Sequence, residues 1–141
     1  MAHVNDFVGI PWKQGGNDKH GADCWGLTVL VMREVYGIDI KEYNGSKASG
    51  DELTNIIESE LASEKWQTPT LPKAGDMVMM YDRGTGLPGH MGVFVDNGNV
   101  LHSPDHDGSN SMPRTSAIHP IRLLKNVFRK LEFYRYDNCT E

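Results

Sequence analysis

A cysteine stands in this chain at a place that suits a nucleophile. Cys24 lies in the stretch GADCWGL, between a polar, glycine-rich run and an apolar run. The apolar run carries leucines and valines at near-helical spacing, and Asp23 before it is a typical helix N-cap. The thiol would then lie in the first turn of a helix, where backbone N–H groups and the helix dipole favour a thiolate. A buried structural cysteine at a helix start is the competing interpretation.

Two histidines that could take the thiol proton lie on the two arms of a predicted hairpin, GHMGVFVDNGNVLHS. A two-residue turn would place His90 and His102 on opposite faces of this hairpin. A three-residue loop over 96–98 would instead pair Gly92 with His102, and the two histidines would share a face as diagonal neighbours. We favour the three-residue loop, because its third position is usually left-handed and Gly98 suits it.

These residues together would provide a complete set for chemistry at an acyl group. Cys24 would be the nucleophile, His90 the base that forms an ion pair with it, and His102 the group that orients the His90 ring. Gly89 and Gly92 flank His90 and would leave room for a substrate beside it. Either histidine alone could be an ordinary structural or surface side chain, so the prediction depends on the combination.

The elements that must position these residues follow from periodicity and turn residues. We expect a first helix over 24–36, ended by Gly37, and a second helix over 51–62. Loops are expected over 9–23 and 107–116, and strands over 75–82, the arms of the 89–103 hairpin, and 127–136. Helices followed by an antiparallel sheet predict an α+β domain, a single one over residues 1–141.

Composition excludes several classes of function. The chain has 141 residues, of which 38% are hydrophobic and 23% charged, as in a globular protein with its own core. A net charge of -5 argues against nucleic-acid binding. No apolar run approaches the roughly 20 residues that a membrane helix needs, and we expect no secretory signal in MAHVNDFVGIPW.

Other residues suggest chemistry that we set aside. A disulfide between Cys24 and Cys139 would need an oxidising compartment, and Cys139 lies where chains usually fray. The segment HSPDHD (102–107) could bind a metal, but a solvated loop explains it as well. We expect core positions for Met77, Met79, Met80 and Trp66. We expect surface positions for His3, His20 and His119.

As a set, the motifs resemble the NlpC/P60 family of papain-like cysteine peptidases. The resemblance extends from about residue 11 to 103 and rests on GG…GADCWGL, on GD (75–76), on GHMGVFV and on VLHS. The form PW…GG…DCWGL is most similar to small phage-encoded cell-wall peptidases and to the peptidase part of tail-assembly proteins. The resemblance implies N-terminal helices packed on a central antiparallel sheet, with no metal or cofactor.

The resemblance also implies what the site would do. Cys24, His90 and His102 would be catalytic, and the reaction would hydrolyse amide bonds of peptidoglycan stem peptides, commonly at the γ-D-glutamyl linkage. The backbone N–H of Cys24 is the expected oxyanion donor, with Asp23 shaping the turn around it. Many members carry a tyrosine where Trp12 stands, and an indole can donate but cannot accept a hydrogen bond. Trp25 either packs in the core or lines the substrate groove.

The partners and the location follow from the same resemblance. We expect a peptidoglycan stem peptide as substrate, other phage tail proteins as partners, and a location in the phage tail or in the host cytoplasm before release. Two alternatives remain open. The chain could be chiefly a structural tail-tip component, or it could be a thiol acyltransferase, because hydrolysis and transfer share the same acyl-enzyme.

Overall fold

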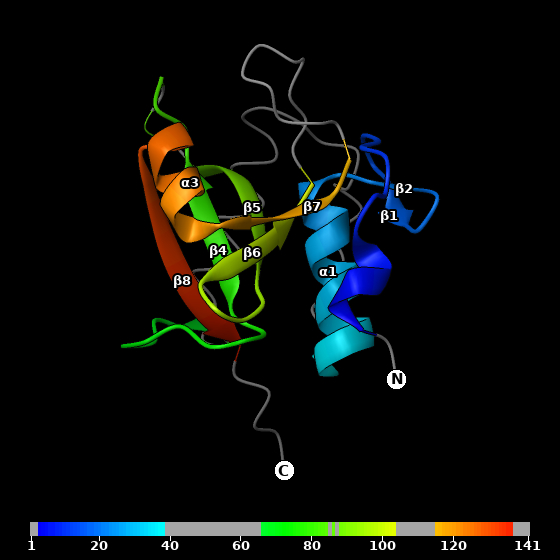
Figure 1. Cartoon of the computed structure of the whole chain (residues 1–141), viewed down its shortest axis with the longest axis horizontal. Coiled ribbons are helices and arrows are strands. Elements are labelled where there is room, and N and C mark those ends of the chain that lie inside the picture. Colours follow the sequence, from blue (N-terminus) through cyan, green and yellow to red (C-terminus); the bar gives the residue numbers. More distant parts are fainter. Residues whose placement is uncertain (1–2, 39–65, 85, 87, 104–114, 137–141) are drawn as a thin grey trace.

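A six-stranded antiparallel sheet forms the centre of the molecule (Figure 1). The computed structural model describes residues 3–38, 66–84, 86, 88–103 and 115–136. The sheet has the strand order β3-β8-β4-β5-β6-β7, and β1 and β2 form a separate small sheet. In chain order the elements are η1 (Val4–Phe7), β1 (Asn17–Asp18), β2 (Gly21–Ala22), α1 (Cys24–Tyr36), β3 (Trp66–Gln67), β4 (Met77–Tyr81), β5 (Pro88–Phe94), β6 (Asn99–His102), β7 (Ala117–Pro120), α3 (Ile121–Val127) and β8 (Lys130–Tyr136). The predicted α+β class is confirmed.

Helix α1 begins and ends at the predicted residues. The Asp23 side chain accepts a hydrogen bond from the backbone N–H of Gly26, which caps the first turn. Gly37 ends the helix in a left-handed conformation with φ 70°, and its N–H bonds to the carbonyl of Met32. The sequence therefore encodes both ends of this helix in residues that immediately flank it.

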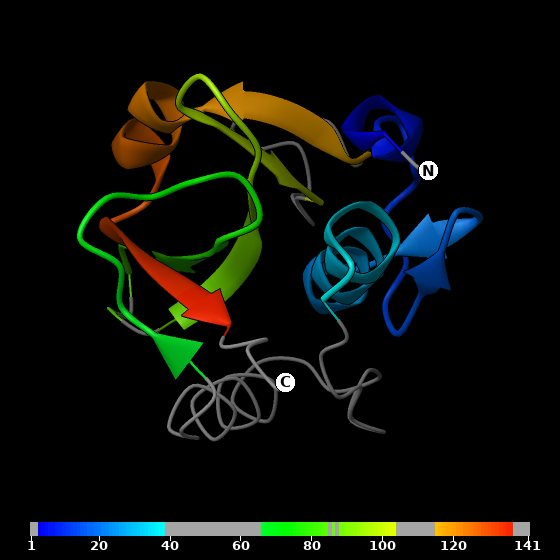
Figure 2. The ribbon, with the colours of Figure 1, turned by 90° about the horizontal axis from the view of Figure 1, so that it is seen from below.

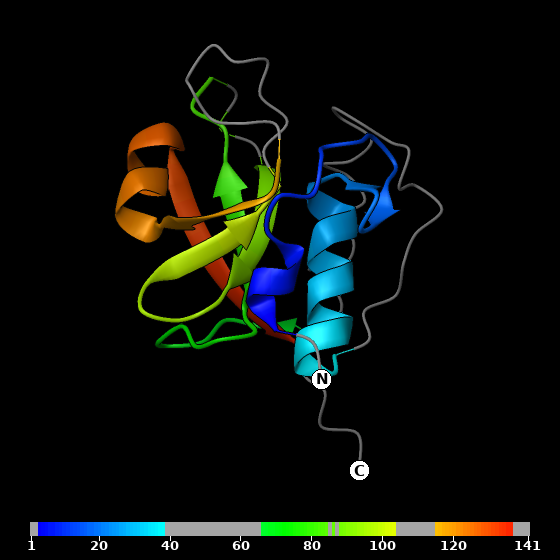
Figure 3. The ribbon, with the colours of Figure 1, turned by 45° about the vertical axis from the view of Figure 1, so that its right-hand side comes forward.

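The two faces of the sheet are covered by different elements. Helix α1 packs on the face of β5 and β6, with η1 beside it (Figure 3). Helix α3 lies on the other side of the curled sheet (Figure 2). The core under α1 includes Leu27, Val31, Met77, Met79, Met91, Val93 and Leu101. The core under α3 consists of Val78, Met80, Phe94, Val100 and Leu124. Because strand residues alternate between faces, the methionines of β4 contribute to both cores.

The hairpin of β5 and β6 has the predicted three-residue loop. Gly92 is paired with His102, and the N–H of Val95 bonds to the carbonyl of Asn99 at 2.9 Å. Gly98 has φ 77°, the left-handed conformation that the prediction assigned to it. The register that sets the faces of His90 and His102 is thus confirmed.

The C-terminal third departs from the prediction. The expected strand over 127–136 begins only at Lys130, because α3 occupies residues 121–127. Four apolar side chains at helical spacing explain this helix, since they pack together on the core under α3: Ile121, Leu124, Val127 and Phe128. The predicted loop over 9–23 contains the short strands β1 and β2, and β7 was not predicted. The predicted helix over 51–62, Cys139 and most of the 107–116 loop lie outside the described residues.

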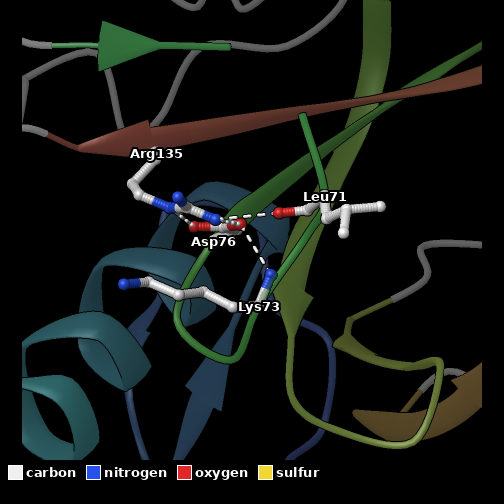
Figure 4. Close-up of polar contacts among 4 residues, drawn as sticks. All are labelled: Leu71, Lys73, Asp76 and Arg135. Atoms are coloured by element: carbon white, nitrogen blue, oxygen red, sulfur yellow. Dashed lines mark hydrogen bonds and ion pairs between the residues drawn. The ribbon is translucent and has the colours of Figure 1, made fainter. Parts of the chain in front are cut away.

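Hydrogen bonds of Asp76, in the motif Gly75-Asp76, stabilise the start of β4 (Figure 4). The buried Asp76 carboxylate accepts two hydrogen bonds of 2.8 Å from the Arg135 guanidinium on β8 and one of 2.8 Å from the Lys73 N–H. Arg135 also donates to the carbonyl of Leu71 at 3.0 Å. Since Met80, near the far end of β4, pairs with His90, this cluster is at the other end of the strand from the histidines. The motif has a structural role.

Candidate active site

A glycine loop and a buried carboxylate build the start of α1. The Asp23 carboxylate accepts hydrogen bonds from the N–H of Gly26 at 2.7 Å and of Gly15 at 2.9 Å. The loop passes so close to the helix that a Cβ on Gly26 would lie 1.9 Å from the carbonyl oxygen of Gly16. Burial raises the pKa of Asp23, and the backbone N–H groups partly offset this effect. The spacing of the GG…DCWG motif therefore reflects close packing of this loop on the first helical turn.

Cys24 is the first residue of α1 and only 6% exposed. It forms no disulfide with any described residue. The Ser103 hydroxyl donates a hydrogen bond of 2.9 Å to the carbonyl of Ala22. This bond ties the chain two residues before Cys24 to the residue that follows His102. The start of α1 is thus held beside the end of β6 by a direct contact as well as by helix packing.

His90 and His102 meet as the hairpin register predicted. The Nε2 atom of His90 lies 2.8 Å from Nδ1 of His102, a hydrogen-bonding distance, and the ring centroids are 5.1 Å apart. Burial lowers the pKa of His102 well below its ordinary value, and its two histidine neighbours lower it further. His102 is therefore neutral at pH 7, where it can donate from only one ring nitrogen.

A third histidine extends this pair, which corrects the predicted surface position of His119. The Nε2 atom of His102 lies 2.8 Å from Nδ1 of His119 on β7. His119 is partly buried, and burial lowers its pKa. The prediction missed this residue because β7 is only 4 residues long and its register on β6 is set across a long connection. The only local sign of a strand at β7 was the sequence Ala-Ile-His-Pro, and it does not indicate which strand β7 pairs with.

Phe128 and Gly92 shape the space around the histidines. The Phe128 ring stacks on the His90 ring at 5.5 Å between centroids and 8° between planes. A Cβ on Gly92 would lie 2.8 Å from the Cβ of His102. Gly92 therefore makes room for His102 and not for a substrate, which corrects its predicted role. Gly89 is exposed next to His90.

The remaining predicted site residues lie near the start of α1. Trp12 is half-buried and forms a parallel bridge with Ala22, which places it along the chain that leads to Cys24. Trp25 is 3% exposed and belongs to the core under α1. Among the residues that the structure describes, no group of histidine, cysteine and carboxylate side chains is arranged to hold a metal ion.

The other predicted positions agree with the structure where it describes them. Met77, Met79, Met80 and Trp66 are buried, as expected. His3 and His20 are exposed, as expected. The segment HSPDHD lies mostly outside the described residues.

The family model for the NlpC/P60 family matches residues 9–125. The chain belongs to the NlpC/P60 family. Murein DD-endopeptidase MepH of Escherichia coli (strain K12) is 30% identical to this NlpC/P60 domain over 74% of the chain and 35% of MepH. Gamma-D-glutamyl-L-lysine dipeptidyl-peptidase of Bacillus subtilis (strain 168) is 29% identical over 70% of the chain and 29% of that protein. The chain thus spans about a third of these relatives. Both are named as peptidases, in agreement with the predicted class of enzyme.

The solved structures agree with this NlpC/P60 assignment at the level of the fold. The NlpC/p60 domain of peptidoglycan hydrolase SagA superposes with a TM-score of 0.56 at 20% identity, over 93% of this chain and 90% of that one. The predicted fold is therefore confirmed. Within the described residues, no helix is both long and apolar enough to cross a membrane.

Proposed function

We propose that this NlpC/P60 domain is a cysteine endopeptidase that hydrolyses amide bonds in peptidoglycan stem peptides. The observation that carries the proposal is the 2.8 Å contact between His90 and His102, beside the helix start that bears Cys24. A base that is oriented by a second buried group is what a cysteine nucleophile requires. Cys24, His90 and His102 have the roles of nucleophile, base and orienting group.

In the acylation step, the Cys24 thiol transfers its proton to Nδ1 of His90, because Nε2 is engaged with His102. The thiolate sulfur then attacks the carbonyl carbon of the scissile amide, and the oxygen takes the negative charge. The backbone N–H of Cys24, in the first turn of α1, donates a hydrogen bond to this oxyanion. The imidazolium of His90 returns its proton to the leaving amine as the C–N bond breaks.

In the deacylation step, His90 removes a proton from water, and the hydroxide attacks the thioester carbonyl. The C–S bond breaks, the acyl group leaves as a carboxylic acid, and the sulfur takes the proton back. Water is the second reactant, and its oxygen ends in the released carboxyl group. The Asp23 carboxylate acts on the turn and not on the reacting atoms. Trp12 and Gly89 line the approach to the thiol, while Trp25 packs in the core beneath it.

The bond proposed for cleavage is the γ-D-glutamyl linkage. The name of the Bacillus subtilis relative specifies that linkage, and that of MepH specifies murein. We further propose that the domain acts in a phage tail or in phage-driven lysis, on the basis of its PW…GG…DCWGL form. Other tail proteins would then be its partners, in the virion or in the host cytoplasm before release.

The test is digestion of purified peptidoglycan, of both the diaminopimelate and the lysine type, with products identified by mass spectrometry. The chain has two cysteines, so Cys139→Ser serves as the control substitution for Cys24→Ala. The wild type and Cys139→Ser should both release fragments cut at the γ-D-glutamyl bond, and Cys24→Ala should release none. Fragments that persist with Cys24→Ala would refute the nucleophile. No fragments from a folded wild-type protein would favour a structural tail component or an acyltransferase that lacks its acceptor.

A further inference from the structure

Three histidines lie in a row across three adjacent strands, with His102 at the centre. His102 on β6 is paired with Gly92 on β5 and Ala117 on β7, so His90 and His119 are its diagonal neighbours on either side. Each contact is 2.8 Å long, and each joins Nε2 of one ring to Nδ1 of the next: His90 to His102, then His102 to His119. Because the rings are joined in series by these contacts, the nitrogen that carries the proton in one ring determines which nitrogen carries it in the next.

The proton count in this row leaves one arrangement that suits catalysis. When His90 holds the proton from Cys24 it carries protons on both nitrogens, so its Nε2–H must donate and Nδ1 of His102 must accept. A neutral His102 can accept at Nδ1 only if its own proton is on Nε2. That Nε2–H then needs an acceptor, and Nδ1 of His119 is the atom in place.

We propose that His119 is a positioning residue that holds His102 in its Nε2–H tautomer, and through it stabilises the imidazolium of His90. This inference deepens the proposed function and rests on it. It differs from a packing role because it depends on one atom, the unprotonated Nδ1 of His119. Burial lowers the pKa of His119 and so favours the neutral form of its ring, and the titratable side chain at hydrogen-bonding distance from Nδ1 is His102.

Three variants of His119 separate the proton acceptor from the ring. His119→Asn keeps an acceptor oxygen near the position of Nδ1, His119→Phe keeps a flat ring without an acceptor, and His119→Leu is a second variant without one. Loss of one hydrogen bond of ordinary strength should lower kcat about tenfold in the Phe and Leu variants, with KM unchanged. His119→Asn should retain most of the wild-type kcat.

The tautomer itself is read by ¹⁵N NMR of the histidine side chains, which needs no substrate. We expect His102 in the wild type and in His119→Asn to be protonated at Nε2, and to shift toward Nδ1–H in His119→Phe. Protonation of wild-type His102 at Nδ1 would overturn the inference, even if no variant folds. An equal loss of activity in all three variants with the tautomer unchanged would also overturn it, since packing alone would explain that result. If the wild type digests no peptidoglycan, the proposed function fails, while the tautomer of His102 still tests the role of His119 separately.

Discussion

Replacement of Asp23 should test how the nucleophile is positioned. Its buried carboxylate accepts hydrogen bonds from the N–H groups of Gly26 at 2.7 Å and Gly15 at 2.9 Å. One bond caps α1 and the other holds the glycine loop on the helix. Asp23→Ala would remove both acceptors and leave two N–H groups to find other partners. Asp23→Asn would keep the acceptor for one of them.

The magnitude follows from these two bonds. Loss of an N-cap side chain costs about 1 kcal/mol, and an N–H left without a partner in a part-buried loop costs about 1–2 kcal/mol more. Burial of the charged carboxylate opposes folding, as the raised pKa of Asp23 indicates, and both substitutions relieve that cost. We therefore expect a loss of about 2 kcal/mol for Asp23→Ala and about 1 kcal/mol for Asp23→Asn, against a total of roughly 5–15 kcal/mol.

The assay is urea unfolding followed by tryptophan fluorescence and by circular dichroism. Glu34→Ala is the matched control, because Glu34 is an exposed carboxylate on the same helix and, among the residues that the structure describes, forms only a surface ion pair with Arg33. That control should stay within about 0.5 kcal/mol of the wild type. Our reasoning about the helix start would be wrong if Asp23→Ala were no less stable than Glu34→Ala, or if Asp23→Asn cost as much as Asp23→Ala.

Three further predictions concern the sheet. Gly92→Ala should lose about 1–3 kcal/mol in urea unfolding and most of its peptidase activity, because the added Cβ would lie 2.8 Å from that of His102; full activity would contradict this. Arg135→Met should lose about 1.5–3 kcal/mol in the same assay, because Asp76 stays buried without its ion pair, while activity per folded molecule should be unchanged. The free energy of unfolding should fall as pH drops below about 6.5, since unfolded His102 binds a proton that the folded protein excludes; His102→Asn should flatten this dependence, and an equal slope would contradict it.

The sequence predicts the structural features that are set by residues close to them in the chain. The bounds of α1 follow from Asp23 and Gly37, which flank it. The contact of His90 with His102 follows from the length of one hairpin loop, because a strand alternates faces with a period of two. These features could be predicted because no distant segment is needed to define them.

The parts that the sequence did not predict depend on distant segments. His119 reaches His102 only because β7 pairs with β6 in one register, and no local pattern sets that register. Phe128 stacks on His90 from the end of α3, although the aromatic residues that follow it had predicted a strand. The glycine at position 92 was interpreted as space for substrate, but the side chain that needs the space is on the neighbouring strand.

The central claim is that Cys24 is a nucleophile activated by His90. The direct test is the pH dependence of Cys24 alkylation by iodoacetamide in a Cys139→Ser background, with the modified peptide identified by mass spectrometry. An ion pair with His90 and the helix dipole should place the midpoint below the ordinary thiol value of about 8.5, and His90→Ala should raise it. A midpoint at or above about 8.5 that does not respond to His90→Ala would contradict the account.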